Sequence, residues 1–444
     1  MEKKMIYKEA KAYLDTFQFH GFRLGLERME AILEALGNPH LAYPAIHVAG
    51  TNGKGSTCAF LSSILAEAGY KTGLYTSPHL FSLTERFKIN QENISEEELA
   101  ALIQEIKVLV EKGYELSYFE YTTAIAMLWF ARQKVDIALF ETGLGGRLDA
   151  TNVIIPEISI ITNVSLDHQS YLGSTIKEIA WEKAGIIKEG VPVVSSVITS
   201  EAENVIAKRC LDLKAPLYKL NRDFFVKSID IMHMNYQGKK LSLEKAPLGL
   251  LGSHQAFNAA LATMSSELLS QQSWKIRKLD VQAGLAHARW PGRGELLYGH
   301  CLVLLDGAHN LDGTVKLRDL LSGLKELNIP GPQQKHFLVW ACSNEGKDKD
   351  FVAMLKEVAP FFNSIIITEP PGPRNPVKIA QWREHLHALP DKIVLSEQWQ
   401  EAIDKSIELA GPKDLVCVAG SLYLVGAARE KLLNKGWKRW IPKI

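Results

Sequence analysis

Short apolar segments alternate with helical patterns along nearly the whole chain, and this alternation limits the fold more than any other feature of the sequence. Such alternation is typical of α/β folds with a largely parallel sheet. In the first part of the chain, strands are predicted at residues 45–49, 72–75, 136–140, 158–162 and 191–195. The helices predicted there cover residues 56–68, 96–111, 121–133, 176–188 and 201–213.

The pattern changes twice in the second half. Residues 223–243 alternate around a turn predicted at Asn235–Gly238, which indicates an antiparallel hairpin. Helices are predicted at 254–269 and 281–288. Trp290–Gly294 is rich in turn residues, and we predict a domain boundary there. The α/β alternation then restarts, with strands predicted at 301–305, 336–341, 364–368 and 415–419 and helices at 314–325, 351–358, 377–386 and 399–409.

The bulk composition argues against several classes of protein. Hydrophobic residues make up 46% and charged residues 23% of the 444 residues, which indicates a globular chain with more than one core. Lysine and arginine number 51 and aspartate and glutamate 50, and the net charge of +1 predicts no nucleic-acid partner. We see no signal peptide, no membrane-spanning run, and no disulfide or zinc pattern among the five cysteines. We therefore expect a cytoplasmic protein, and we expect a monomer.

A glycine-rich segment follows the first predicted strand and precedes a helix. It reads Gly50-Thr51-Asn52-Gly53-Lys54-Gly55-Ser56-Thr57. Closely spaced glycines turn backbone N–H groups around an anion, and the helix N-terminus adds positive potential. Lys54 is placed to bridge the β- and γ-phosphates of a nucleotide, and Ser56 or Thr57 to reach phosphate or Mg²⁺. The spacing departs from the usual phosphate loop, because Val48 replaces its first glycine and Gly55 follows the lysine. A turn that binds no nucleotide is the alternative interpretation.

Polar side chains follow three other predicted strands. Ser77 follows the strand at 72–75, Glu141 follows the strand at 136–140, and His168 comes after the strand at 158–162. Because α/β sheets bind ligands at the carboxyl ends of their strands, these side chains could converge on one point. Glu141 suits Mg²⁺ on a nucleotide, whereas histidine is a less usual ligand for that ion. Taken singly, the three have alternative interpretations as a helix cap, a solvated loop acid and a structural hydrogen-bonding group.

Together these motifs resemble the folylpolyglutamate and dihydrofolate synthases of the Mur ligase superfamily. The resemblance runs from about residue 20 to about residue 430 and rests on several ordered motifs, including the glycine-rich loop, Ser77-Pro78-His79 and Glu141-Thr142-Gly143-Leu144-Gly145-Gly146. It implies a Mur ligase-like α/β architecture. Residues 1–293 are expected to form a P-loop ATPase-like domain with a mostly parallel sheet, which binds ATP and folate. Residues 294–444 are expected to form a smaller Rossmann-like glutamate-ligase domain.

The resemblance also implies roles for residues of the first domain. The family's magnesium ligands fall on Ser77, Glu141 and His168, and two Mg²⁺ ions are expected. Lys183 matches a lysine that is often carbamylated; without the resemblance it would be interpreted as an ordinary lysine on a helix surface. The expected contacts with ATP are Thr51, Asn52, Gly53, Lys54, Gly55, Ser56 and, on the adenine side, Asn258 in the family's H-x-x-x-N motif.

Two motifs lie at the junction and in the second domain. Pro291-Gly292-Arg293 matches a P-G-R motif, which makes Arg293 a contact for the γ-phosphate. Asp306-Gly307-Ala308-His309-Asn310 matches a D-x-A-H-N motif, in which Asp306 would hold the ribose while His309 and Asn310 face the incoming amino acid. Arg86 and His309 are candidates for contacts with glutamate. A lone arginine or aspartate is otherwise more often part of a surface ion pair. Catalytic roles are expected for Lys54, His168, Lys183 and Arg293.

The implied reaction is the ATP-dependent ligation of L-glutamate to a carboxylate of tetrahydrofolate. It passes through an acyl phosphate and releases ADP and phosphate. Leu148-Asp149-Ala150 matches a segment that contacts the pterin in bifunctional bacterial members, which also use dihydropteroate. Against that second activity, Arg23 stands where those members often have the first residue of D-L-G-L-E-R. Two alternatives stay open: an amino-acid ligase with a non-folate acceptor, and a switch that hydrolyses ATP without ligation.

Overall fold

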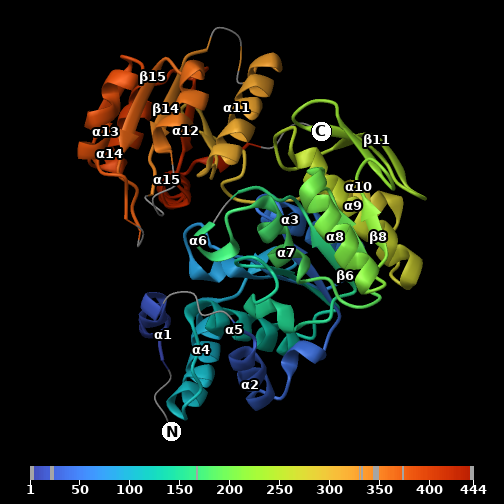
Figure 1. Ribbon diagram of the computed structural model, residues 1–444. Coiled ribbons are helices and arrows are strands. Elements are labelled where there is room, and N and C mark those ends of the chain that lie inside the picture. The colour runs from blue at the N-terminus through green and yellow to red at the C-terminus, as the bar shows by residue number, and fades with distance from the viewer. Residues whose placement is uncertain are drawn as a thin grey trace. The chain divides into compact units, whose positions relative to one another are not determined.

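The computed structural model describes residues 5–20, 25–166, 169–329, 331, 334–343, 350–372 and 375–440. The chain divides into two compact units, each built on its own sheet (Figure 1). The N-terminal unit comprises Met1–Lys227, Asn235–Ala246 and Phe257–Arg289, and the C-terminal unit comprises Ser228–Met234, Pro247–Ala256 and Trp290–Ile444. In the described ranges, no helix combines the length and the apolar character needed to cross a bilayer.

The N-terminal unit contains an eight-stranded sheet in the order β4-β3-β2-β5-β1-β6-β7-β8. The six strands from β2 to β8 in this order are parallel, and β3 and β4 add an antiparallel edge. The strands are β1 (Ala45–Ala49), β2 (Thr72–Tyr75), β3 (Phe87–Ile89), β4 (Glu92–Asn93), β5 (Ile137–Glu141), β6 (Ile158–Ile161), β7 (Val193–Ser195) and β8 (Leu217–Lys219). β1 and β5 lie between other strands and are buried along their whole length, which explains their nearly continuous apolar sequences.

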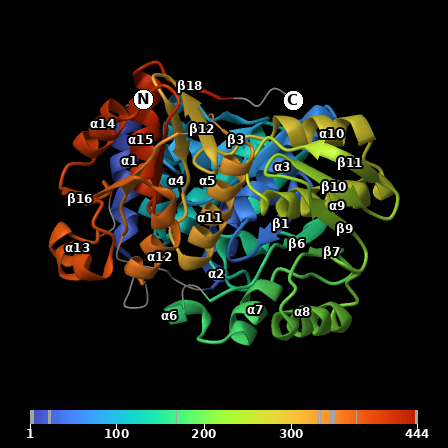
Figure 2. The same cartoon turned by 90° about the horizontal axis from the view of Figure 1, so that it is seen from above.

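Helices of this unit bury their apolar residues against the sheet. One apolar core lies under α1, α2, α4 and α5, and another lies under α7 and α8. α3 packs on β1, β2 and β5 and is itself packed against α10 (Figure 2). The helices are α1 (Tyr7–Asp15), α2 (Glu27–Ala35), α3 (Lys54–Glu67), α4 (Glu96–Glu111), α5 (Tyr118–Arg132), α6 (Gln169–Leu172), α7 (Ile176–Ala184), α8 (Ser200–Asp212), α9 (Gln255–Gln272) and α10 (Lys278–His287).

The predicted hairpin is a three-stranded sheet, in the order β11-β10-β9. Its strands are β9 (Phe225–Ser228), β10 (His233–Gln237) and β11 (Ser242–Pro247). The turn predicted at Asn235–Gly238 is wrong, because Asn235 lies inside β10 and the turn begins at Gly238, whose N–H donates to the Leu241 carbonyl. The side chain of Asn235 accepts a hydrogen bond from the N–H of Lys245 at 2.7 Å. This asparagine therefore bonds across to the neighbouring strand instead of turning the chain.

The C-terminal unit contains a seven-stranded sheet in the order β16-β15-β14-β17-β13-β12-β18. The five strands from β16 to β13 are parallel, whereas β12 and β18 are antiparallel. The strands are β12 (Glu295–Tyr298), β13 (Leu302–Leu305), β14 (His336–Trp340), β15 (Ser364–Thr368), β16 (Ile393–Ser396), β17 (Leu415–Ala419) and β18 (Lys438–Arg439). The helices are α11 (Leu311–Glu326), α12 (Phe351–Val358), α13 (Ile379–His385), α14 (Trp399–Leu409) and α15 (Leu422–Asn434). The predicted α/β class is confirmed in both units.

Candidate functional site

The glycine-rich loop connects β1 to α3, and Lys54 is the first residue of that helix. Gly53 precedes it with φ = 84°, a left-handed conformation that glycine adopts without strain. The turn leads directly into the first turn of α3, whose backbone N–H groups have no partner within the helix. The strand, glycine-rich turn and helix predicted from the sequence are therefore all present.

The loop is held by the segment that follows β6. Asn163 accepts the N–H of Asn52 on its side-chain oxygen at 2.7 Å, and the hydroxyl of Thr162 donates to the Asn52 carbonyl at 2.6 Å. The N–H of Ser165 donates to the hydroxyl of Thr51 at 3.1 Å. These bonds join two neighbouring strand ends, so the loop is organised by the fold itself. From the sequence, Thr162 was predicted only as the last residue of a strand, and this role of Thr162 and Asn163 was missed.

The ammonium group of Lys54 donates back to its own loop. Its Nζ lies 3.0 Å from the Gly50 carbonyl and 3.2 Å from the Thr51 carbonyl. The charge is thus held at the mouth of the loop, where an entering phosphate would meet it. Ser56 and Thr57 follow on the first turn of α3 and are both buried. The Thr57 hydroxyl has no hydrogen-bond partner among the described residues.

Asn258, on α9, lies beside the loop. A side chain at position 53 would collide with the side-chain oxygen of Asn258, so the asparagine occupies the space that Gly53 leaves open. These residues are about 200 positions apart in the sequence, yet the fold brings them together within the N-terminal unit. The resemblance placed Asn258 near the nucleotide, and the structure places it next to the glycine-rich loop.

Ser77 and Glu141 lie together at neighbouring strand ends. The N–H of Ser77 donates to the carboxylate of Glu141 at 3.2 Å, and Glu141 is buried at the end of β5. A carboxylate and a hydroxyl are the hard oxygen donors that Mg²⁺ on a nucleotide takes, and such an ion keeps few protein ligands. The pair therefore fits the ion. His168 lies outside the described residues, within which no group of three or more acidic, histidine or cysteine side chains could hold a metal.

Asp149 organises the segment that follows Glu141. Its Oδ2 accepts the N–H groups of Gly143 and Leu144, both at 2.9 Å. Its Oδ1 accepts the N–H of Thr151 at 3.0 Å and the hydroxyl of the same residue at 2.5 Å. Burial raises the pKa of this carboxyl, whereas the four hydrogen bonds oppose the rise. Both oxygens of Asp149 thus serve the backbone of its own segment. Leu148 is half-buried and Ala150 is buried beside it.

His47, in the middle of β1, extends this network. Its Nε2 lies 2.8 Å from the hydroxyl of Thr151, which donates to Asp149. The imidazole must then donate from Nε2, which leaves Nδ1 without a proton and, among the described residues, without a partner. Burial, together with nearby Lys188, lowers the pKa of His47 to about 3. The ring is therefore neutral at physiological pH.

Lys183 lies near the end of α7 and is only 3% exposed. The interpretation of this residue as an ordinary helix-surface lysine is therefore wrong. The segment after Glu141 packs directly on this helix end, where the N–H of Arg147 donates to the Glu182 carbonyl at 2.8 Å. Gly146 allows the close approach, because a side chain there would meet the carbonyls of Glu182 and Lys183.

Buried Arg86 and half-buried His79 form a second polar pair in the N-terminal unit. Arg86 ends the short helix η3 (Leu83–Arg86), and its Nε donates to Nδ1 of His79 at 2.9 Å. Burial and the charge of Arg86 lower the pKa of His79 to about 3. The ring of Tyr118, at the start of α5, lies against the guanidinium group. His79 and Tyr118 were missed as site residues, because no local pattern links either of them to Arg86.

In the C-terminal unit, Asp306 joins the two motifs of the junction. Its carboxylate accepts the N–H of Gly294 at 2.8 Å and the N–H of Ala308 at 2.9 Å. The N–H of Gly307 donates to the Gly292 carbonyl at 2.7 Å. Burial raises the pKa of Asp306, and the charge of nearby Arg293 opposes the rise. The P-G-R and D-x-A-H-N motifs thus form one cluster after β13.

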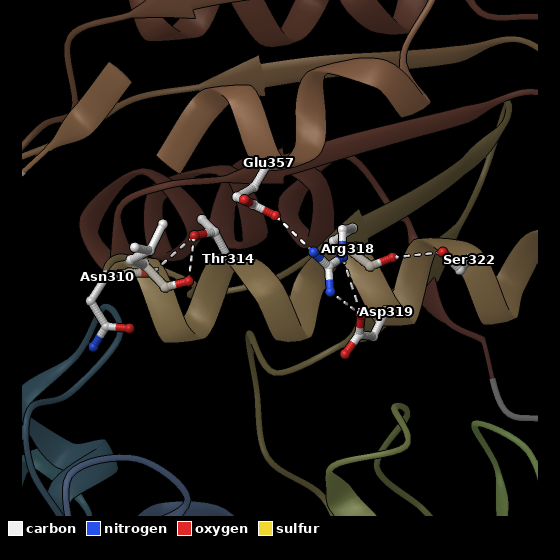
Figure 3. Close-up of polar contacts among 7 residues, drawn as sticks. Asn310, Thr314, Arg318, Asp319, Ser322 and Glu357 are labelled. Carbon is white, nitrogen blue, oxygen red and sulfur yellow. Dashed lines mark hydrogen bonds and ion pairs between the residues drawn. The ribbon is translucent and has the colours of Figure 1, made fainter. Parts of the chain in front are cut away.

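His309 and Asn310 follow in the same segment. Nδ1 of His309 lies 2.8 Å from the Gly307 carbonyl, which fixes the orientation of the ring. The side-chain oxygen of Asn310 accepts the N–H of Gly313 at 2.8 Å and caps α11. The carbonyl of Asn310 accepts from the hydroxyl of Thr314 at 3.1 Å (Figure 3). Asn310 therefore stabilises the start of the helix.

The same helix is tied to its neighbour further along. Arg318 donates to Asp319 of α11 at 3.0 Å and to Glu357 of α12 at 2.9 Å (Figure 3). This clip holds the two helices over the sheet and lies two turns away from Asn310. It stabilises α11, the helix that follows His309 and Asn310.

Two serines at adjacent strand ends complete this edge. Ser343 follows β14 and Ser421 follows β17, and their hydroxyl oxygens lie 3.5 Å apart. β17 pairs with both β14 and β13, so the two serines share the carboxyl edge that carries Asp306. Neither Ser343 nor Ser421 was predicted as a site residue from the sequence. A serine two or three residues after an apolar strand was the available signal.

Two protein families match the chain, one over the motifs of the first part and the other over the motifs of the second part. Residues 48–266 match the Mur ligase middle domain, and residues 292–422 match the Mur ligase glutamate ligase domain. A dihydrofolate synthase/folylpolyglutamate synthase of Bacillus subtilis is 35% identical over 441 residues, which cover 96% of this chain and 99% of that protein.

Solved structures are similar over the same span. An FPGS in complex with AMPPCP and folate has a TM-score of 0.80 at 32% identity and covers 97% of this chain and 100% of that one. FolC of E. coli in complex with DHPP and ADP has a TM-score of 0.84 at 28% identity, with 96% and 98% covered.

The two sheets, the glycine-rich loop and these matches define an ATP-dependent ligase of the Mur type. Within that class, the chain belongs to the dihydrofolate synthase/folylpolyglutamate synthase family. The family predicted from the ordered motifs is confirmed.

Proposed function

We propose that the chain ligates L-glutamate to a carboxylate of tetrahydrofolate, at the expense of ATP, and that it also converts dihydropteroate to dihydrofolate. The observation that carries this proposal is the arrangement of the N-terminal unit, in which the glycine-rich loop and the Ser77–Glu141 pair follow strands of one sheet. The ligands of similar proteins support it, because one such structure holds AMPPCP with folate and another holds ADP with DHPP.

The reaction has two steps. An oxygen of the acceptor carboxylate attacks the γ-phosphorus of ATP, and the bond from that phosphorus to the leaving ADP breaks. The amine of glutamate then attacks the acyl carbon, phosphate leaves, and the nitrogen loses a proton to give the amide. Because side chains form no covalent bond in either step, positioning and neutralisation of charge supply the catalysis.

Lys54 is assigned to the β- and γ-phosphates, because its ammonium group already lies at the mouth of the loop. Ser77 and Glu141 are assigned to Mg²⁺, together with His168, and Lys183 is assigned to a carbamylated state that would support a second ion. When bound, Mg²⁺ would neutralise charge on the phosphates. Arg293 is assigned to the γ-phosphate.

The remaining assignments concern the adenine and ribose of ATP, the pterin and the incoming glutamate. Asn258 serves the adenine and Asp306 the ribose. Since both oxygens of Asp149 accept hydrogen bonds from its own segment, we assign pterin contacts to Leu148 and to the backbone of Ala150. His309 and Ser421 are assigned to the incoming glutamate, since both lie at one edge of the C-terminal sheet.

Residues 1–293 are accordingly assigned to ATP and folate, and residues 294–444 to glutamate ligation. We place the protein in the cytoplasm, as a monomer that binds small molecules, with neither nucleic acid nor membrane as a partner. The five cysteines, all free and buried, are consistent with a reducing compartment.

An acceptor-dependence assay tests the proposal. Radiolabelled glutamate, ATP and Mg²⁺ are supplied with tetrahydrofolate, with dihydropteroate, with a UDP-linked peptide precursor, or without an acceptor, and Lys54→Ala serves as the inactive control. Glutamate incorporation with tetrahydrofolate and with no other acceptor would confirm the folate ligase activity. The same result would exclude ligation of glutamate to dihydropteroate. Phosphate release that needs neither glutamate nor acceptor would favour a switch, and incorporation only with the peptide precursor would favour another ligase.

A further inference from the structure

Asn152 joins two segments of the N-terminal unit that are distant in the sequence. It lies in the short helix η4 (Ala150–Val153) and is only 5% exposed. Its side-chain nitrogen, Nδ2, donates to the Arg147 carbonyl at 2.9 Å and to the Gly185 carbonyl at 3.1 Å. The first carbonyl belongs to the segment that follows β5, and the second lies directly after α7. One buried amide group therefore bridges the two segments.

The backbones of these segments lie in direct contact beside the amide. A side chain at position 146 would meet the carbonyls of Glu182 and Lys183, and a side chain at position 185 would meet the backbone of Arg147. The N–H of Arg147 also donates to the Glu182 carbonyl at 2.8 Å. Gly146 and Gly185 thus each leave a space that the other segment occupies, and the position of one backbone sets the position of the other.

Other hydrogen bonds hold Asn152 and the turn after α7. Nζ of Lys188 donates to the Asn152 carbonyl at 2.9 Å, and the N–H of Asn152 donates to the Asp149 carbonyl at 2.8 Å. The hydroxyl of Ser159, in β6, donates to the Ile186 carbonyl at 2.9 Å. This last bond fastens the turn after α7 to the sheet and not to the segment that follows β5. Ser159 therefore offers a control for the role of the asparagine.

The geometry points to Asn152 as a positioning residue, which fixes Lys183 relative to Glu141. Lys183 is buried near the end of α7, and Glu141 is the last residue of β5. Groups that serve one reaction centre must be held within about 0.5 Å of the productive arrangement. The asparagine links the two backbones that carry these residues. The inference rests on the proposed function, which assigns Glu141 to Mg²⁺ and Lys183 to a carbamylated state.

An amide suits this position because its two N–H groups diverge from one nitrogen and reach two acceptors. An ionised carboxylate of nearly the same size has no donor, so Asn152→Asp would direct an oxygen at each of the two carbonyls. The variant therefore reverses the polarity of the bridge while it preserves the volume. We expect the two segments to separate there and Lys183 to lose its fixed place.

Carbamylation gives a measurement that does not depend on turnover. The uncharged Nζ of Lys183 attacks the carbon of CO₂, an N–C bond forms, and the nitrogen loses a proton, which leaves a carbamate anion. Isotope-labelled bicarbonate makes this carbon visible by NMR, and Lys183→Ala identifies its signal. We expect the signal in wild type and a much weaker signal in Asn152→Asp at the same bicarbonate concentration.

Steady-state kinetics gives the second measurement. Asn152→Asp is expected to need about 10-fold more Mg²⁺ for half-maximal ligation, as is typical when a residue that orients metal ligands is lost. The KM for the folate acceptor is expected to stay within about twofold, because the change acts on the metal side. Ser159→Ala also loses a buried hydrogen bond at the turn after α7, and it is expected to retain the wild-type carbamate signal and Mg²⁺ requirement.

Lys188→Met replaces Asn152→Asp in the comparison if the latter melts far below wild type. It removes the donor to the Asn152 carbonyl but keeps the amide, and it should give a smaller change in the same direction. A wild type without the carbamate signal would overturn the inference. Wild-type values in Asn152→Asp, or equal losses in Asn152→Asp and Ser159→Ala, would overturn it too. These outcomes leave glutamate ligation by the wild type intact, whereas a wild type that incorporates no glutamate would refute the proposed function itself.

Discussion

The guanidinium group of Arg293 lies against the backbone of Gly307, in the space that any side chain at position 307 would fill. The two residues belong to different motifs, which Asp306 also joins through the N–H of Gly294. Position 307 thus helps to set where the arginine points. A glycine in the D-x-A-H-N motif is needed here because of a neighbour that lies 14 positions earlier in the chain.

Gly307→Ala is therefore expected to displace Arg293 and to lower kcat at least 10-fold, because removal of one charge-stabilising contact typically costs about 100-fold or more and displacement removes part of it. The KM for the folate acceptor is expected to stay within twofold. Steady-state kinetics checks both values. Gly331→Ala is the matched control, because a side chain there would meet no atom of the residues that the structure describes. Equal kcat in the two variants would contradict the role given to Arg293.

Lys54→Ala is expected to lower kcat for glutamate ligation by about 100-fold or more, because the charge at the mouth of the glycine-rich loop is lost. The thermal stability is expected to change little, since among the described residues the ammonium group bonds only to two carbonyls of its own loop. Glutamate incorporation and a melting curve give the two measurements. The matched control is Lys112→Ala, which removes an exposed lysine after α4. Substantial residual ligation would exclude Lys54 from phosphate binding.

Asp149→Asn tests whether this carboxylate organises the segment after Glu141. An amide has one acceptor oxygen in place of two, so at least one of the bonds to Gly143, Leu144 and Thr151 is lost. We expect the free energy of unfolding to fall by about 1.5–3 kcal/mol, the value of a buried bond to a charged group. Urea unfolding measures this loss.

The same variant should also need more Mg²⁺ for half-maximal activity, because Glu141 lies just before the displaced segment. Thr151→Val is the comparison, since it removes only the hydroxyl between Asp149 and His47. If Asp149→Asn is as stable as wild type and its KM for the acceptor alone rises, then its carboxylate contacts the pterin and does not organise the segment.

His47 predicts the direction in which stability changes with pH. Its pKa is lowered to about 3 in the folded chain and is about 6.5 when unfolded, so between these values the unfolded chain binds the additional proton. The contribution of the neutral ring to the free energy of unfolding is fully present above about pH 6.5 and is lost as the pH falls toward 3. The loss from this group is about 1.4 kcal/mol per pH unit within that window.

The comparison is between wild type and His47→Gln, which keeps a donor toward Thr151 but does not titrate. Urea unfolding at pH 7.5, 6.0 and 5.0 is expected to give a steeper acid-side loss for wild type. Parallel pH profiles for the two proteins would show that His47 is accessible to protons in the folded chain.

Much of the fold was readable in the sequence, because its strands are short apolar runs bounded by turn residues. β1, β2, β15 and β17 have the predicted bounds at both ends. Strand β12, which lies between β13 and β18, was not predicted, since it begins with the acid Glu295, which is buried and pairs with Arg429 at 2.8 Å. Pairing of that kind depends on the tertiary fold, and a local pattern carries no sign of it.

In the site, too, some residues could be found from the sequence and other features depended on the tertiary fold. Ser77 and Glu141 were found because each follows a strand, and the order of parallel strands brings such residues together. The burial of Lys183 could not be inferred, because the segment of Gly146 packs on the end of α7 only once the chain is folded. Likewise, the carboxylate of Asp149 was identified as part of a motif, but its four hydrogen bonds became apparent only when the backbone was placed.

The bonds from Thr162 and Asn163 to Asn52 have a mechanical consequence. They fasten the loop assigned to ATP to the segment that leads, in the sequence, toward His168. The loop assigned to the nucleotide is therefore held by the segment that leads to a residue assigned to the metal. A substitution in either stretch, such as Asn163→Ala, should then alter the apparent affinities for ATP and Mg²⁺ together, by similar factors.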